Sequence, residues 1–384
     1  MESRPIIFHR SGAVSDWHCP RSRFYGYEIY GRGISPPETQ LSLYLGTLIH
    51  DGVAAMVHNV PIEKIVEAGV RQLRAKLLEG RGPHGPKELD SDAQYFAEEQ
   101  CALAEGLLRG FYRARWPQIC EAYPEVVLCE KELVYDYEID GQQLRFLSKP
   151  DLVRRDKEGN LWVFEWKTTS SNKEEWIHQW ETAVQVHAQI KTIETALGEP
   201  VAGCIVQGFY KSYVSQWNRL ESIFAYAYHK PGEPPFSKPI WAYEYKAGLR
   251  KSPIWQREGG VKQWVEEMPL TLLASQFPQT PPIFVKDRLV DAFFKQQGHR
   301  EVQINDFMEQ TYPDDEGYDE MLGVVFPQHF ESCNAWNRPC SFKRLCFGAD
   351  VVPLSIGYTL RHSHHQLEQE QFDKATGGSY SGVC

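Results

Sequence analysis

Apolar residues recur every three or four positions in three early segments, which is the spacing of a helix with one buried face. These segments are residues 39–57, 62–78 and 91–116. The second and third are separated by the glycine- and proline-rich stretch 80–87, which we interpret as a linker. The first part of the chain is therefore expected to be helical.

After residue 125 the apolar positions alternate with polar ones, which is the pattern of strands. Strands are predicted over 126–138, 143–155 and 161–168, joined by the turn sequences Asp140-Gly141 and Asp156–Asn160. A helix over 174–197 and a strand over 202–210 follow. The order helix, three strands, helix, strand predicts an α+β fold with a central mixed sheet.

The remainder of the chain shows weaker patterns. Further strands are expected within 218–248 and helices over 261–276 and 287–310. We expect one domain over residues 1–365, with its core at about 40–210 and an insertion at about 211–320. His362, His364 and His365 are expected in a solvated polar run, and residues 366–384 are predicted to form a polar, flexible tail.

Composition narrows the possible function classes. The chain has 384 residues and a net charge of −10, which argues against a protein that coats nucleic acid without regard to sequence. It still permits a nuclease, which needs only a local basic groove. No run of 18 apolar residues and no secretory-type N-terminal segment are present, so no membrane association and a reducing, cytoplasmic location are expected. In that compartment, spaced cysteines are more often metal ligands than disulfides.

The third predicted strand carries two charged residues on one face. Alternation places Trp162, Phe164 and Trp166 together, on a face that must be buried under a helix. It places Glu165 and Lys167 side by side on the opposite face.

The preceding strand brings a second carboxylate to this point. If the loop Asp156–Asn160 is symmetric, Asp151 lies directly opposite Glu165, with Cβ atoms about 4.5–5.5 Å apart. Two facing carboxylates cost stability unless a cation lies between them, and a hard divalent ion is the usual partner. Such an ion can polarise a phosphodiester oxygen and activate water, while Lys167 positions that water or stabilises charge on the phosphate.

A purely structural interpretation of this hairpin remains open. The same register places Lys149 opposite Lys167, so two lysines and two carboxylates can form a surface square of ion pairs. Pro150 favours the functional interpretation, because proline within a strand occurs at edges or bulges. A bulge at Pro150 would change the direction of the Asp151 side chain, as bulges often do beside active sites.

Lys149-Pro150-Asp151, followed after thirteen residues by Glu165-Trp166-Lys167, resembles the motif of the PD-(D/E)XK nuclease superfamily. The predicted element order resembles its restriction-endonuclease-like αβββαβ core. The resemblance implies a nuclease that hydrolyses DNA with Mg²⁺ or Mn²⁺. Asp151, Glu165 and the backbone carbonyl of Trp166 would hold the metal ion, with Lys167 as a catalytic residue.

Two further elements resemble the RecB-like branch of that superfamily. Gly46 to His50 resembles its Gly-…-His element, which implies His50 as a metal ligand; a partly buried structural histidine is the alternative. Gln185 and Gln189 lie one helical turn apart and resemble a Gln-x-x-x-Tyr element, with glutamine in place of tyrosine. Gln185 would bind the phosphate or order the water, whereas outward-facing glutamines are the alternative.

Four cysteines form another candidate metal site. Cys333, Cys340 and Cys346 cluster near one end of the sequence and Cys19 lies near the other. This arrangement resembles the iron–sulfur staple of AddB-like and CRISPR-adaptation exonucleases, which implies a 4Fe-4S cluster. A zinc site or unligated thiols are the alternatives. The basic-aromatic stretch after Cys19 implies that Arg21 and Arg23 bind nucleic acid.

Taken together, these resemblances imply an exonuclease that acts on single-stranded DNA or frayed ends. The implied processes are DNA repair, recombination, phage replication or CRISPR adaptation. One alternative is an endonuclease with the same chemistry, for example one that acts on branched DNA. The other is a non-catalytic DNA-binding subunit that retains the fold. Protein partners are not predicted.

Overall fold

The fold comes from a computed structural model that describes residues 4–37, 41–78, 91–169, 173–214, 219–221, 245–246, 249–250, 258–311, 315–337, 339–348 and 352–375. Within these ranges no helix is both long enough and apolar enough to cross a membrane. The predicted linker 80–87 and most of the strands predicted within 218–248 lie outside the described residues.

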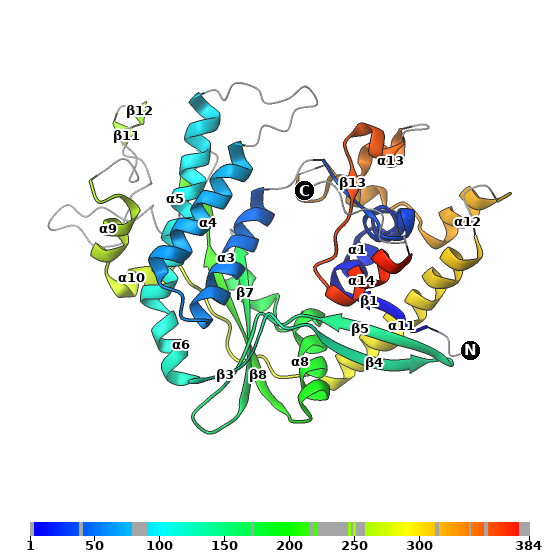
Figure 1. The fold of residues 1–384 in the computed structure, drawn as a ribbon, viewed down its shortest axis with the longest axis horizontal. Coiled ribbons are helices and arrows are strands. Elements are labelled where there is room, and N and C mark those ends of the chain that lie inside the picture. Colours follow the sequence, from blue (N-terminus) through cyan, green and yellow to red (C-terminus); the bar gives the residue numbers. More distant parts are fainter. Residues whose placement is uncertain are drawn as a thin grey trace.

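The central sheet contains four strands in the order β3 (Glu125–Cys129), β6 (Leu152–Arg155), β7 (Leu161–Thr169) and β8 (Val201–Tyr210). β6 pairs antiparallel with both β3 and β7, whereas β7 and β8 are parallel. The predicted α+β fold with a central mixed sheet is therefore confirmed. Figure 1 shows these strands at the centre of the molecule, with β7 and β8 side by side.

Two of the predicted strands are divided in the structure and contribute to two sheets. The segment 126–138 becomes β3 and β4 (Leu133–Ile139), and the segment 143–155 becomes β5 (Gln142–Ser148) and β6. β4 and β5 pair in a second sheet, in which β1 (Ile6–His9) lies parallel to β5. The breaks fall at Glu130, whose φ of 50° is outside the strand region, and at Pro150, which has no backbone N–H to donate.

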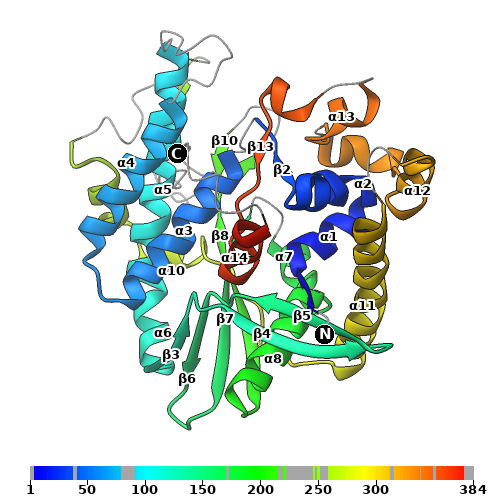
Figure 2. The same ribbon diagram turned by 45° about the vertical axis from the view of Figure 1, so that its right-hand side comes forward.

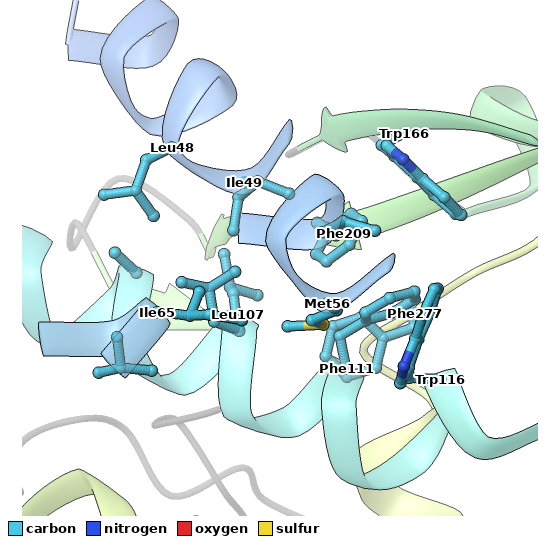
Figure 3. Packing of buried hydrophobic residues seen from close by; sticks show 14 of the residues in the cluster. Leu48, Ile49, Met56, Ile65, Leu107, Phe111, Trp116, Trp166, Phe209 and Phe277 are labelled. Atoms are coloured by element: carbon cyan, nitrogen blue, oxygen red, sulfur yellow. The ribbon is translucent and has the colours of Figure 1, made fainter. Parts of the chain in front are cut away.

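Helices cover one face of the central sheet. They are α3 (Leu41–Val57), α4 (Ile62–Leu78), α5 (Ser91–Ala114) and α6 (Trp116–Ala122). Phe111 of α5 contacts the rings of Trp166 and Phe209, and Figure 3 shows these side chains gathered in the core. The tryptophan face of β7 is therefore buried under helices, as its alternation predicted.

The opposite face of the central sheet packs on α8 (Val184–Leu197), which follows the short helix α7 (Lys173–His178). One helix was predicted over 174–197, but a turn at residues 179–183 divides it. The second sheet packs on α11 (Asp287–Gln310), where Phe293 and Phe294 meet Phe146 of β5. Figure 2 shows α11 beside β4 and β5.

The other elements are short. Within the segment predicted as an insertion lie β9 (Ser212–Val214), β10 (Arg219–Glu221), β11 (Tyr245–Lys246), β12 (Leu249–Arg250), α9 (Gly260–Glu267) and α10 (Leu270–Ala274). Near the two ends of the chain lie α1 (Arg10–His18), α2 (Pro20–Arg23), β2 (Ile34–Ser35), α12 (Tyr318–Val325), α13 (Lys343–Phe347) and β13 (Thr359–Leu360). β2 pairs with β13, so the N-terminal and C-terminal segments lie together.

The segment predicted as a flexible tail begins instead with a packed helix, α14 (Gln366–Ala375). Glu132 accepts hydrogen bonds from the backbone N–H groups of Gln366 and Leu367, at 2.8 and 3.2 Å. It also lies 3.1 Å from Nδ1 of His365, which is not in a solvated run. A carboxylate at the first turn stabilises a helix, and this partner lies over 200 residues away, where local sequence patterns cannot indicate it. Residues 376–384 lie outside the described part.

A second carboxylate joins α14 to the N-terminal strand. Oε2 of Glu368 lies 3.4 Å from Nε2 of His9, and its Oε1 accepts a hydrogen bond of 2.6 Å from Arg361. The rings of His9 and His365 lie 5.0 Å apart, centroid to centroid. Two histidines are therefore packed against each other where α14 meets β1.

Acidification is expected to destabilise this junction. Burial lowers the pKa of His9, and burial followed by the charge of His9 lowers the pKa of His365 to about 3. The unfolded chain, with histidine pKa values of about 6.5, therefore takes up these protons first as the pH falls. Each histidine should therefore lower the free energy of unfolding by up to about 1.4 kcal/mol per pH unit below pH 6.5.

Urea unfolding between pH 7.5 and 5 would measure this loss of stability. His365→Gln should make the free energy of unfolding less dependent on pH. An identical pH dependence in wild type and variant would contradict it.

Candidate metal centre and active site

The pairing of β6 with β7 brings Asp151 and Glu165 together. Leu152 lies opposite Phe164, so the next pair outward in this register is Asp151 and Glu165. The backbone N–H of Trp166 donates a hydrogen bond of 2.7 Å to Oδ2 of Asp151. Because Pro150 separates β5 from β6, Asp151 lies where the two sheets meet.

Glu165 is held by three side chains. Lys167 donates to its Oε2 at 2.8 Å, Gln185 to the same oxygen at 3.0 Å, and Gln189 to Oε1 at 2.6 Å. Gln185 and Gln189 project from one face of α8, as their spacing predicts. Both glutamines therefore point into the site rather than outward.

His50 projects from α3 toward the same point. Its Nδ1 lies 3.0 Å from Oδ1 of Asp151. Burial alone would lower the pKa of His50, but the charge of Asp151 and hydrogen bonds to Asp151 and Glu130 outweigh burial and raise it to about 10. The imidazole therefore faces a strongly negative environment.

Glu130 is a member of this group that sequence reasoning missed. Its Oε1 lies 3.8 Å from Nδ1 of His50, and its Oε2 forms an ion pair of 2.8 Å with Lys149. The predicted strand 126–138 runs through Glu130, and alternation within a strand gives no reason to place this side chain beside His50. The signal that could have indicated it is its position across the hairpin from Asp151, whose carbonyl accepts a hydrogen bond from the N–H of Glu130.

The square of ion pairs considered as an alternative does not form, because Lys149 and Lys167 bind different carboxylates. Lys149 pairs with Glu130 and Lys167 with Glu165. Asp151 and Glu165 are only 6% and 1% exposed, so this is not a surface network. Burial, and then the charge of Asp151, raise the pKa of Glu165, which shows that the two carboxylates repel each other.

The donor groups present here suit a divalent cation. One ligand atom from each of His50, Glu130 and Asp151 lies within 4.8 Å of the other two. Imidazole and carboxylate oxygens are ligands for Mn²⁺, and carboxylates are ligands for Mg²⁺. The side-chain oxygens of Gln185 and Gln189 are buried without a hydrogen-bond partner among the described residues, so the site also has unused acceptors.

The four predicted cysteine ligands lie around one small pocket. Cys19 lies between α1 and α2, Cys333 in the helical segment Phe330–Asn337, and Cys346 in α13. The N–H of Cys340 donates to the carbonyl of Cys333 at 2.8 Å, so the chain folds back between them. Burial, followed by the charges of the other three thiols, raises the pKa of Cys346 to about 11. The wide spacing in sequence therefore does not keep the thiols apart.

Arg21 and Arg23 have protein partners in this structure. Arg23 is 5% exposed and donates to Glu28 at 2.6 Å and to Glu301 at 3.0 Å. Arg21 donates to the carbonyl oxygens of Phe326 and Leu322. Both guanidinium groups therefore hold the N-terminal segment to α11 and α12. Their binding to nucleic acid stays a prediction.

Comparison with known proteins assigns the class. A model of the PD-(D/E)XK nuclease superfamily matches residues 17–210, a range that contains His50, Asp151 and Glu165 to Lys167. The chain belongs to this superfamily. Membership implies a metal-dependent nuclease, a hydrolase with DNA as its substrate.

Two other comparisons add little to that assignment. Among curated proteins, none matches the chain. A solved structure titled "Crystal structure of SSO0001" is similar at 14% sequence identity, over 36% of this chain and 71% of that chain, with a TM-score of 0.20. That likeness is too slight to bear on fold or function.

Proposed function

We propose that this chain is a DNA exonuclease that acts on single strands or frayed ends. The observation that carries the proposal is the convergence of His50, Asp151 and the Glu165–Lys167 pair at one buried point. The gathering of Cys19 with Cys333, Cys340 and Cys346 supports the exonuclease assignment, because the exonucleases that the sequence resembles share that arrangement.

His50, Asp151 and Glu165, with the backbone carbonyl of Trp166, would hold Mg²⁺ or Mn²⁺. Glu130 would contribute a further carboxylate, since its Oε1 lies 3.8 Å from Nδ1 of His50. When bound, the ion would polarise a phosphodiester oxygen and lower the pKa of an attacking water.

The remaining side chains would orient the reactants. Lys167 would position the water or stabilise negative charge that develops on the phosphate, because its ammonium group already lies among the carboxylates. Gln185 has an unused, buried side-chain oxygen that can accept a hydrogen bond from that water. Gln189 would fix the orientation of Glu165 through its hydrogen bond of 2.6 Å.

The four cysteines would hold a 4Fe-4S cluster rather than zinc. The four thiols line one pocket, and their arrangement resembles the iron–sulfur staple of AddB-like and CRISPR-adaptation exonucleases. Zinc bound by the same four thiols is the alternative.

The test uses end-labelled linear DNA and circular single-stranded DNA, with and without Mn²⁺. An exonuclease releases mononucleotides or short products from linear DNA and leaves the circle intact. Cleavage of the circle would favour the endonuclease alternative. Binding of both DNAs without cleavage under any metal condition would favour the non-catalytic subunit and overturn the proposal.

His50→Ala is expected to weaken Mn²⁺ binding more than Mg²⁺ binding. Imidazole is a softer ligand than a carboxylate, and Mn²⁺ gains more from it than Mg²⁺ does. Calorimetric titration of the wild type and the variant with each ion would measure the two losses. Equal losses would place His50 outside the ligand set.

A further inference from the structure

The N-terminal strand leads directly to the active site. β1 runs parallel to β5 in a register that pairs His9 with Leu147. The next residue, Arg10, is therefore level with Ser148, three residues before Asp151. Arg10 also begins α1, whose first turn contains no acidic residue. Arg10 therefore follows the end of β1 at the point where the two sheets meet.

The charge of Arg10 interacts with the charges of two proposed catalytic residues, Glu165 and Lys167. The charge of Glu165 raises the pKa of Arg10, although burial, the larger effect, lowers it. Burial lowers the pKa of Lys167, but the charges of Glu165 and Asp151 outweigh burial and raise it overall, and the charge of Arg10 is a smaller effect that opposes this rise. Arg10 and Lys167 are therefore two cations close to the same carboxylate.

Arg10 differs from neighbouring arginines because none of the described residues forms a hydrogen bond or an ion pair with its guanidinium group. Arg23, Arg300 and Arg361 each bind a carboxylate. Arg10 is half-buried, yet no hydrogen bond or ion pair engages its guanidinium within the described part of the chain. A partly desolvated charge without a partner is costly, and a planar guanidinium matches the oxygens of a phosphate.

We propose that Arg10 is a phosphate-binding residue of the active site, which holds the DNA backbone beside Lys167 during cleavage. The proposal rests on the proposed nuclease function and adds a residue outside the Asp/Glu-x-Lys motif. Its role would be to contact a phosphate, so it acts on both binding and the rate of the reaction.

The experiment compares Arg10→Gln and Arg10→Lys with the wild type on linear single-stranded DNA. Arg10→Gln should lower kcat/KM roughly 10- to 100-fold, the usual range for loss of a charge-assisted hydrogen bond. Arg10→Lys should recover part of this loss because it restores the charge. The matched control is Arg145→Gln, which removes an exposed arginine of β5 that pairs with Asp136 and should leave cleavage unchanged.

A binding measurement separates a phosphate contact from a structural role. The background is Glu165→Gln, which is expected to bind DNA without cleaving it. Adding Arg10→Gln to it should lower the slope of log Kd against log salt by about 0.7, as expected for one lost contact with single-stranded DNA. An unchanged slope, or cleavage equal to wild type, would overturn the role of Arg10. A fall in melting temperature that accounts for the lost cleavage would also overturn it. A wild type that cuts no DNA would instead refute the proposed function.

Discussion

Replacement of Glu165 with glutamine is expected to reduce DNA cleavage by roughly a thousandfold or more. The change removes a proposed metal ligand, and the loss of several kcal/mol of transition-state stabilisation corresponds to a rate effect of that size. DNA binding should be largely retained, because Glu165 is 1% exposed and repels phosphate rather than contacting it. Rates of single-turnover cleavage and DNA-binding isotherms would measure the two effects.

Measured without divalent metal ions, the same variant should have a melting temperature equal to or above that of the wild type. Burial and the charge of Asp151 raise the pKa of Glu165 in the folded chain, so its charge opposes folding at neutral pH. Glutamine has no such charge and nearly the same shape. Glu138→Gln is the matched control, since Glu138 is exposed on β4 and bonds only to Gln143 among the described residues. Wild-type cleavage by Glu165→Gln would refute the active-site assignment.

Replacement of Cys19 with serine is expected to lower the melting temperature by about 5–10 °C. Cys19 and Cys346 are joined through more than 300 residues, and a link that closes so long a loop stabilises the fold by on the order of 5 kcal/mol in the simplest chain-entropy model. For a chain of this size, each kcal/mol corresponds to roughly 1–2 °C. The iron content of protein purified without oxygen should fall from about four per chain to near zero.

Cys120→Ser is a suitable control for that change, because Cys120 is partly buried on α6, outside the pocket that holds the four cysteines. It should leave unchanged both the iron content and the brown colour expected of a protein with an iron–sulfur cluster. A colourless wild type with stoichiometric zinc would reject the cluster while retaining the link between the two ends. A wild type free of metal, with no effect of Cys19→Ser on stability, would reject the link itself.

The sequence alone could predict the hairpin of the candidate active site, because the relations that define it involve residues close together in the sequence. Alternation along β7 determines which residues share a face, and the five-residue turn fixes which residue of β6 lies opposite Glu165. Gln185 and Gln189 share a face for the same reason, since four residues make about one helical turn. These relations involve neighbours in sequence or strands joined by a short loop.

Other parts of the structure depend on contacts between segments far apart in the sequence, which local sequence patterns cannot predict. Glu130 reaches His50 only because β3 ends there in a left-handed backbone conformation, which alternation cannot indicate for a glutamate. α14 is polar along its sequence, and its stabilising partners, Glu132 and His9, are supplied by distant segments. The segment 143–155 is divided between two sheets at Pro150, and a proline at this position indicates a bulge within one strand as readily as the end of a strand.

The position of β1 has a consequence for how the chain matures on the ribosome. β1 is synthesised well before its partner β5, which follows more than 130 residues later, and α14, which contacts His9, is synthesised later still. A nascent chain can therefore complete the β6–β7 hairpin while Arg10 and Cys19 still lack their neighbours. If Arg10 and the cysteine site act as proposed, cutting activity would appear only after the last third of the chain has been translated. Incomplete chains would then be inert toward DNA.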